Sequence, residues 1–172
     1  MINNNELINQ IKSYNRFLNS ESLNKAYNFA LEAHQNQKRE EGVPYIIHPV
    51  AVAKILTELK LDSATITTGL LHDTIEDTNV TYDTVKKEFG EEVANLVEGV
   101  TKISALEDKA SGDSKAENFR KLILATSKDI RVLLVKIADR LHNMRTIKAI
   151  KNEDKRKRIA QETMETYDPL AD

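Results

Sequence analysis

The chain has 172 residues, of which 40% are hydrophobic and 30% charged, which is enough for one compact domain with one core. Its formal charge is -2, from 25 Lys and Arg against 27 Asp and Glu, so no overall positive charge favours nucleic acid or an anionic membrane. The chain contains no cysteine, which excludes disulfides, thiolate metal ligands and cysteine nucleophiles.

The polar N-terminus lacks the apolar run of a signal peptide, and no window approaches the roughly 18 apolar residues of a membrane span. We therefore expect a cytoplasmic protein without membrane or nucleic-acid partners, and the sequence leaves its oligomeric state open. The basic cluster KNEDKRKRIA (residues 151–160) contains interleaved acids, which favours a solvated helix surface over an RNA site.

Helical periodicity dominates the chain. After a short helix over residues 6–18, the cap signal Asn19-Ser20 opens a helix whose apolar residues recur at three- and four-residue spacing from Leu23 to His34. Pro49 fits the first turn of the following helix, with His48 at its entrance. Further helices are expected at about residues 63–77, 81–89, 91–103, 117–126, 129–150 and 153–167.

No strand pattern of comparable length competes, so the predicted fold class is all-α. The stretch SALEDKASGDSKAE, residues 104–117, has small and charged residues without periodicity and is predicted to be a surface loop. We expect residues 1–20 to form a helical extension and residues 21–172 to form the single domain.

The segment LLHDTIEDT gathers polar residues at helical spacing. His72 and Glu76 are four residues apart, as are Asp73 and Asp77, so on a continuous helix they share one face. A face with three carboxylates repels itself unless a cation is present, and a divalent ion supplies that charge. A solvated acidic stripe is the alternative interpretation of this motif taken alone.

Asp139 lies in the apolar run VKIADRLHNMRT, where a buried carboxylate needs a partner. An ion pair with Arg140 or a neighbouring helix is one explanation, and metal ligation is the other. His48, His72, Asp73 and Asp139 together form a set of nitrogen and oxygen ligands that suits Mn²⁺, Fe²⁺ or Mg²⁺ better than structural zinc. Such a site favours metal-assisted hydrolysis of a phosphate ester.

Six segments in order resemble one family: AxxFAxxAHxxQxR, GxPYIIHPVxVA, LLHDTIEDT, FGEEVxxLVxGVTKI, ENFRKLILA and DIRVLLVKIADRLHNMRT. They resemble the hydrolase domain of the RelA/SpoT homologues, within the HD superfamily, from about residue 27 to residue 170. The resemblance implies a helical domain with a metal site in its core. It also implies Mn²⁺-dependent removal of the 3′-pyrophosphate from guanosine tetra- and pentaphosphate (ppGpp and pppGpp), giving GDP or GTP and pyrophosphate.

By this resemblance the metal ligands are His48, His72, Asp73 and Asp139, the same four residues selected above. The catalytic acids are Glu76 and Asp77. The resemblance points to the guanine nucleotide as the partner of Arg39, Tyr45 and Asn143, and Arg140 is added as a further candidate for substrate binding. For His34, in the family's AH position, a structural role as a hydrogen-bonded histidine is preferred.

The sequence departs from the family pattern after Arg39, where Glu40 and Glu41 bring two acids near a polyanionic substrate. Their repulsion is on the order of 1 kcal/mol per charge, a several-fold loss of affinity. Two alternatives to alarmone hydrolysis therefore stay open: an HD phosphohydrolase acting on another nucleotide, or a silent nucleotide-binding remnant of a bifunctional enzyme. Because no synthetase segment follows, synthesis is not expected.

Overall fold

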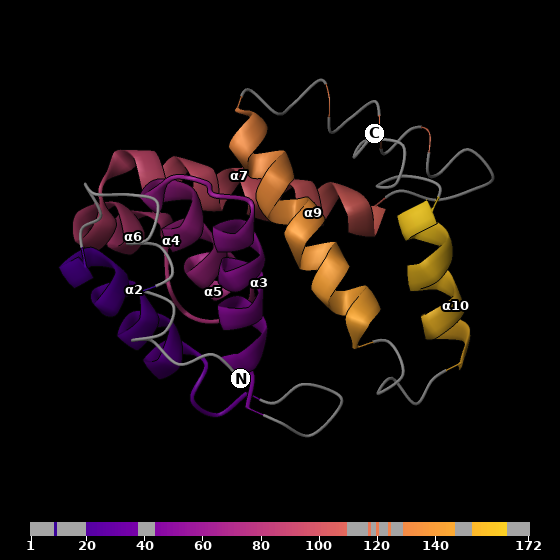
Figure 1. The fold of residues 1–172 in the computed structure, drawn as a ribbon, viewed down its shortest axis with the longest axis horizontal. Coiled ribbons are helices and arrows are strands. Elements are labelled where there is room, and N and C mark those ends of the chain that lie inside the picture. The colour runs from indigo at the N-terminus through magenta and orange to yellow at the C-terminus, as the bar shows by residue number, and fades with distance from the viewer. Residues whose placement is uncertain are drawn as a thin grey trace.

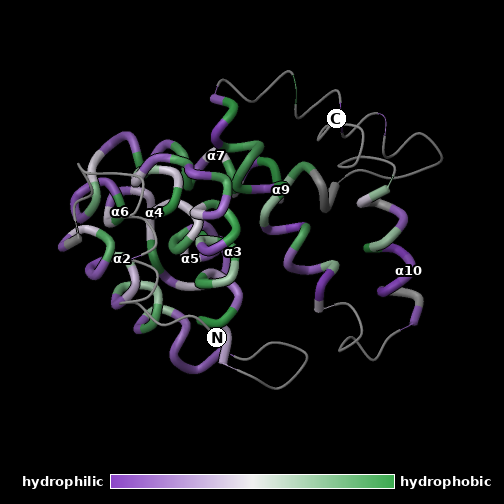
Figure 2. The backbone as a smooth tube through the Cα atoms, in the orientation of Figure 1, coloured by the Kyte–Doolittle hydropathy of each residue, from purple (hydrophilic) through white to green (hydrophobic). Residues whose placement is uncertain are grey.

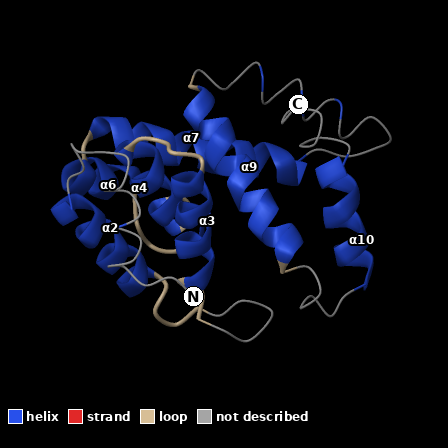
Figure 3. Cartoon of the chain, viewed as in Figure 1, coloured by secondary structure: helices blue, strands red, loops and turns tan. Residues whose placement is uncertain are grey.

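The computed structural model describes residues 20–37, 44–109, 129–146 and 153–164, together with residues 9, 117, 120 and 124. In these residues every regular element is a helix (Figure 3), so the predicted all-α class is confirmed. The helices are α2 (Ser20–Ala33), α3 (Ile47–Glu58), α4 (Ser63–Leu71), α5 (Thr74–Asp77), α6 (Tyr82–Phe89), α7 (Glu91–Lys109), α9 (Ile130–Arg145) and α10 (Glu153–Glu162). None of those described is long and apolar enough to cross a membrane.

Side-chain caps begin three of these helices. Asp62 caps α4, Thr81 caps α6 and Asp129 caps α9, each accepting a hydrogen bond from a backbone N–H of the first turn. Such caps satisfy N–H groups that have no partner inside the helix. Gly90 ends α6 with a φ of 94°, a conformation that favours glycine. The predicted start and end of this helix are both confirmed.

Helix α4 packs against α2, α3, α7 and α9, and Figure 1 shows it among the helices on the left of the molecule. Its approach to α3 depends on Gly69, where a Cβ atom would lie only 2.7 Å from Leu56 Cδ1. Figure 2 shows hydrophobic stretches where α3, α4 and α7 meet, whereas α10 is mostly hydrophilic. The largest fully buried apolar side chains are Leu23, Leu56, Ile66, Leu70, Leu71 and Ile103.

Three predicted boundaries are wrong. The helix expected over residues 129–150 ends at Arg145, with Thr146 as its C-cap. The helix expected over residues 63–77 is interrupted at His72 and Asp73, which form a turn between α4 and α5. The loop expected from residue 104 instead begins as helix, because α7 continues to Lys109 and buries Ser104 against α9. The helix predicted over residues 6–18, most of that over 117–126 and the rest of the loop lie outside the described residues.

Candidate metal centre

Four side chains converge between α3, the α4–α5 turn and α9. His48, His72, Asp73 and Asp139 each offer one ligand atom, and these atoms all lie within 4.8 Å of one another. His48 Nε2 lies 2.6 Å from Asp139 Oδ1, and His72 Nε2 lies 3.0 Å from Asp73 Oδ2. His48, His72 and Asp139 are at least 93% buried. The structure therefore brings together the four residues that the sequence selected.

The interruption between α4 and α5 places two adjacent residues in this cluster. Helix α4 ends at Leu71, and the Thr74 hydroxyl donates a hydrogen bond to the Leu71 carbonyl oxygen at 2.7 Å. His72 and Asp73 then both direct a side-chain atom at the cluster. On an uninterrupted helix, consecutive residues point about 100° apart. The turn therefore makes the adjacent pair usable as two ligands of one ion.

The charged side chains of the cluster shift one another's pKa. Burial by itself lowers the pKa of His72, but the Asp73 carboxylate and the hydrogen bond with Asp139 raise it well above its usual value. Burial raises the pKa of Asp73, whereas His72 outweighs that effect and lowers it to about 2. The Asp139 charge also acts against the ionised form of Asp73. Two carboxylates held this close create a negative potential that suits a divalent cation.

Three of the four side chains, His48, His72 and Asp139, also have a partner on the side that faces away from the cluster. The His72 Nδ1 atom lies 2.7 Å from the Gly69 carbonyl oxygen, and the His48 Nδ1 atom lies 2.7 Å from His142 Nδ1. Outer partners of this kind orient metal ligands and set the histidine tautomer. The cluster is therefore preorganised on both its histidines.

The two aspartates are held by side chains. The Tyr45 hydroxyl donates to Asp73 Oδ2 at 2.6 Å. The Lys136 ammonium donates to Asp139 Oδ2 at 3.3 Å and to Ser104 Oγ at 2.9 Å. Burial raises the pKa of Asp139, but the Lys136 charge and the hydrogen bonds with His48 and His72 together outweigh it, so the net pKa lies well below the usual value. Asp139 thus stays ionised, with Oδ1 directed at His48 and His72.

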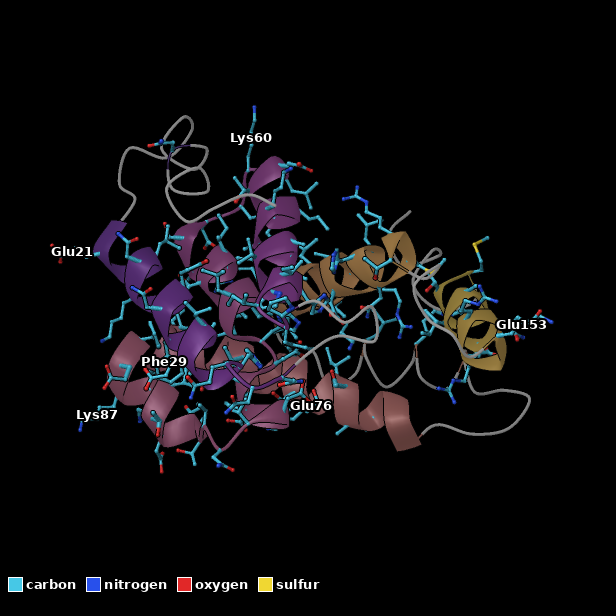
Figure 4. The ribbon with its side chains drawn as sticks, turned by 90° about the horizontal axis from the view of Figure 1, so that it is seen from below. Glu21, Phe29, Lys60, Glu76, Lys87 and Glu153 are labelled. Atoms are coloured by element: carbon cyan, nitrogen blue, oxygen red, sulfur yellow. The ribbon has the colours of Figure 1, made fainter. Side chains whose placement is uncertain are left out.

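The predicted catalytic acids lie beside this cluster at the surface. Glu76 and Asp77 belong to α5 and are both exposed. Figure 4 shows Glu76 in the middle of the molecule, between Glu21 and Glu153 at opposite ends. Burial of its inner side and the nearby Asp73 charge raise the pKa of Asp77, and the Tyr45 hydroxyl lies 3.3 Å from its Oδ2 atom. A carboxyl whose pKa is raised is suited to exchange a proton.

A groove of about 730 Å³ opens on the other side of Asp77, between the end of α2 and the segment after α5. Its polar lining consists mainly of amide and hydroxyl groups, from Gln35, Asn36, Gln37, Thr78, Asn79 and Thr84. Asp77 and Glu32 are the charged residues among its described lining, so no lysine or arginine there compensates phosphate charge. The described lining of this groove thus offers hydrogen-bonding groups and two carboxylates.

The predicted substrate-binding residues have different surroundings. Tyr45 is partly buried and its hydroxyl is directed at Asp73 and Asp77. Arg140 is 95% buried within α9, and Asn143 is partly exposed near the end of the same helix. Arg39 lies outside the described residues, as do Glu40 and Glu41. The contacts of Tyr45 thus connect it directly to the cluster.

Sequence reasoning missed two residues that contact the proposed ligands from outside the cluster, Lys136 and His142. Lys136 was grouped with the apolar run, although its position three residues before Asp139 on a helix predicts that they are neighbours. His142 lies three residues after Asp139 on the same helix and is buried against His48. His34, expected to be structural, is 98% buried, with Nδ1 3.0 Å from Gln37 Oε1 and its ring against Tyr45.

Comparison with known proteins agrees with the motifs. The model of a family described as HD domain matches residues 26–172. The GTP pyrophosphokinase rsh of Brucella melitensis is 53% identical over 166 residues, which cover 96% of this chain and 22% of that protein. The guanosine-3′,5′-bis(diphosphate) 3′-pyrophosphohydrolase of Aquifex aeolicus is 55% identical over 152 residues, covering 88% of this chain and 21% of that protein.

The bifunctional (p)ppGpp synthase/hydrolase SpoT of Escherichia coli K12 is 54% identical over 149 residues, covering 87% of this chain and 21% of that protein. The chain thus spans about a fifth of the length of these relatives. A solved structure described as a metazoan ortholog of SpoT that hydrolyzes ppGpp has a TM-score of 0.69 at 24% identity, covering 89% of this chain and 87% of that one. That likeness shows the fold.

The helical fold, its cluster of His and Asp side chains and the family match over most of the chain together define the class of protein. The chain belongs to the HD domain family. Within this family, its relatives place it among the RelA/SpoT homologues.

Proposed function

We propose that this protein is a Mn²⁺-dependent hydrolase that removes the 3′-pyrophosphate from ppGpp and pppGpp. The observation that carries the proposal is the cluster of His48, His72, Asp73 and Asp139, with ligand atoms within 4.8 Å of one another. The names of the relatives from Aquifex aeolicus and Escherichia coli, at 54 to 55% identity, support the alarmone as substrate. We assign the activity to residues 21–172, with residues 1–20 as an extension.

The ligand set fits a hard or borderline divalent ion. Two imidazoles and two carboxylates suit Mn²⁺, and the chain has no cysteine that would favour a softer metal. When bound, such an ion lowers the pKa of a coordinated water and neutralises charge on a phosphoryl group. Before a metal binds, the charges of His72 and Lys136 favour the ionised forms of Asp73 and Asp139, so both carboxylates are available as ligands.

The reaction requires one proton to leave water and one to reach the departing 3′ oxygen. The water oxygen forms a bond to the phosphorus attached to the 3′ oxygen, the bond from that phosphorus to the 3′ oxygen breaks, and GDP or GTP leaves with a 3′ hydroxyl. Asp77 accepts the proton of the water or returns one, because its pKa is raised and Tyr45 orients it. Glu76, exposed on the same short helix, is the second acid.

Substrate contacts are proposed for Arg39, Tyr45, Arg140 and Asn143. Arg140 and Asn143 follow Asp139 on α9, so this helix connects the metal cluster to the proposed nucleotide side. Arg39 supplies a positive charge, which offsets part of the repulsion from Glu40 and Glu41. Those two acids motivate the second candidate, an HD phosphohydrolase acting on another nucleotide.

The test is to incubate metal-stripped protein with ppGpp, with and without Mn²⁺, and to resolve the products by anion exchange. We expect GDP and pyrophosphate only with Mn²⁺, and loss of both in Asp73→Ala. Asp83→Asn, which removes an exposed carboxylate from α6, is the matched control and should keep full turnover. A folded, Mn²⁺-binding protein that leaves ppGpp intact contradicts the proposal.

The same assay separates the alternatives. Equal or faster turnover of guanosine or adenosine monophosphates and diphosphates favours the second candidate. Nucleotide binding without turnover of any of them indicates a silent remnant. To assign the acids, Asp77→Asn and Glu76→Gln are compared. If Asp77 is the base, only Asp77→Asn removes the ionisation that controls the dependence of kcat on pH.

A further inference from the structure

Two buried histidines, His48 and His142, contact each other through their Nδ1 atoms. His48 at the start of α3 and His142 near the end of α9 have their Nδ1 atoms 2.7 Å apart, with ring centroids 4.9 Å apart. Both side chains are at least 93% buried. At this distance exactly one proton fits between the two nitrogens, so one ring donates and the other accepts.

The other nitrogen of His48 determines which ring donates when a metal is bound. His48 Nε2 faces the cluster, 2.6 Å from Asp139 Oδ1 and 3.7 Å from Asp73 Oδ2. A neutral imidazole carries one N–H, and the nitrogen that binds a metal must not carry it. The proton of a metal-binding His48 is therefore on Nδ1, and His142 Nδ1 must accept it.

For His72, a backbone carbonyl oxygen determines the position of the ring proton. Its Nδ1 atom lies 2.7 Å from the Gly69 carbonyl oxygen, a group that can only accept a hydrogen bond. When His72 binds a metal through Nε2, its remaining ring proton is therefore on Nδ1. Among the described contacts of His48, the acceptor in the equivalent place is the ring of His142.

We propose that His142 is a positioning residue that fixes His48 in its metal-binding tautomer, rather than a donor to the substrate. This inference rests on the metal centre of the proposed function. Unlike a carbonyl, His142 can also donate from Nδ1. Without metal, His48 then keeps its proton on Nε2, donates it to Asp139 Oδ1 and accepts from His142. The same pair therefore satisfies the buried nitrogens of His48 in both states.

The test compares two substitutions of similar shape. In His142→Asn the side-chain oxygen takes the place of Nδ1 and still accepts, whereas His142→Leu has no acceptor. Each metal-stripped full-length protein is titrated with Mn²⁺ by calorimetry, without nucleotide. Because loss of an outer partner costs roughly 10-fold to 100-fold in metal affinity, we expect that loss for His142→Leu. His142→Asn should keep most of the affinity.

Circular dichroism and thermal unfolding of the metal-free proteins establish that each variant folds. Should His142→Leu fail to fold, His142→Gln replaces it, because its amide lies beyond the Nδ1 position. Unchanged Mn²⁺ affinity in the variant without an acceptor overturns the inference. So does an equal loss in His142→Asn, since that result means that any change of the ring has the same effect.

A second measurement reads the tautomer directly. In the protein loaded with Zn²⁺ as a diamagnetic ion, the ¹⁵N shifts of the His48 ring should show the proton on Nδ1. A proton on Nε2 would overturn the inference. Wild-type protein that binds Mn²⁺ but does not cleave ppGpp contradicts only the proposed function, whereas protein that binds no divalent ion contradicts both.

Discussion

The Tyr45 hydroxyl donates a 2.6 Å hydrogen bond to Oδ2 of Asp73 and lies 3.3 Å from Oδ2 of Asp77. It thereby connects a proposed metal ligand with a proposed catalytic acid. Burial, followed by the charge of Asp73, raises the pKa of Tyr45 far above its usual value, so the hydroxyl stays protonated and available as a donor. The ring is held in place by His34, with ring centroids 4.7 Å apart.

We expect Tyr45→Phe to lower both Mn²⁺ affinity and kcat by about tenfold, because Asp73 loses the partner that orients it. Tyr82→Phe is the matched control, since it removes an exposed hydroxyl that donates to Asn95 and should change neither quantity. Calorimetry and steady-state kinetics measure the two effects. A rise in KM alone, with unchanged metal affinity, would assign Tyr45 to substrate binding instead.

Removal of the buried ammonium should weaken the fold before any substrate is added. Lys136→Met leaves the ionised Asp139 without its principal compensating charge, and a broken buried pair costs about 3 kcal/mol. We therefore expect the free energy of unfolding of the metal-free protein, measured in urea, to fall by that amount. Lys102→Met removes an exposed lysine from neighbouring α7 and should cost under about 1 kcal/mol. Equal losses in both variants would argue against a special role for Lys136.

Mn²⁺ should stabilise the folded chain through the four-ligand cluster. At a free concentration 100 times the Kd, a ligand that binds only the folded state contributes about 2.7 kcal/mol. For a chain of this size that corresponds to a rise in Tm of roughly 5 to 10 °C. Differential scanning calorimetry measures the rise, which should be absent in Asp139→Asn. If that variant is stabilised as much as the wild type, Mn²⁺ binds elsewhere.

Acid should destabilise the helix starts at Asp62 and Asp129. Hydrogen bonds with Thr65 and the charge of Arg131 outweigh burial and lower the pKa of Asp62, and hydrogen bonding to Arg131 lowers that of Asp129. A carboxyl whose pKa is lower in the folded state stabilises it above the ordinary pKa. This contribution is present above the ordinary value of 3.8 and is lost as the pH falls through the lower folded-state pKa.

The comparison of Tm between pH 6 and pH 3 in wild type and Asp62→Asn tests this dependence. Asparagine keeps the cap of α4 but has no ionisable group, so the variant should lose less stability on acidification. Its Tm at pH 6 should be close to that of the wild type, because the ion pair with Arg131 is partly exposed. The same acid sensitivity in both proteins would exclude Asp62 as a contributor.

Local signals in the sequence were sufficient for much of the fold. The range predicted for residues 81–89 agrees with α6 at both ends, because the caps at Thr81 and Gly90 depend on residues close in the chain. The same reasoning failed at residues 72–73. The Thr74 hydroxyl bonds to the Leu71 carbonyl oxygen there, and His72 Nδ1 bonds to the Gly69 carbonyl oxygen. These side-chain hydrogen bonds compete with the backbone hydrogen bonds that would continue the helix, and the helical period of the sequence does not reveal them.

The sequence by itself determined the helical class and the identity of the four candidate ligands, because periodicity and the chemistry of His and Asp are properties of residues. Only the tertiary structure decided how those ligands are held. His48 meets His142 across 94 positions, and Tyr45 meets Asp73 across 28. Such contacts depend on how α3, α4 and α9 pack. Packing fixes the distances between residues that are remote in the chain, and no local pattern records them.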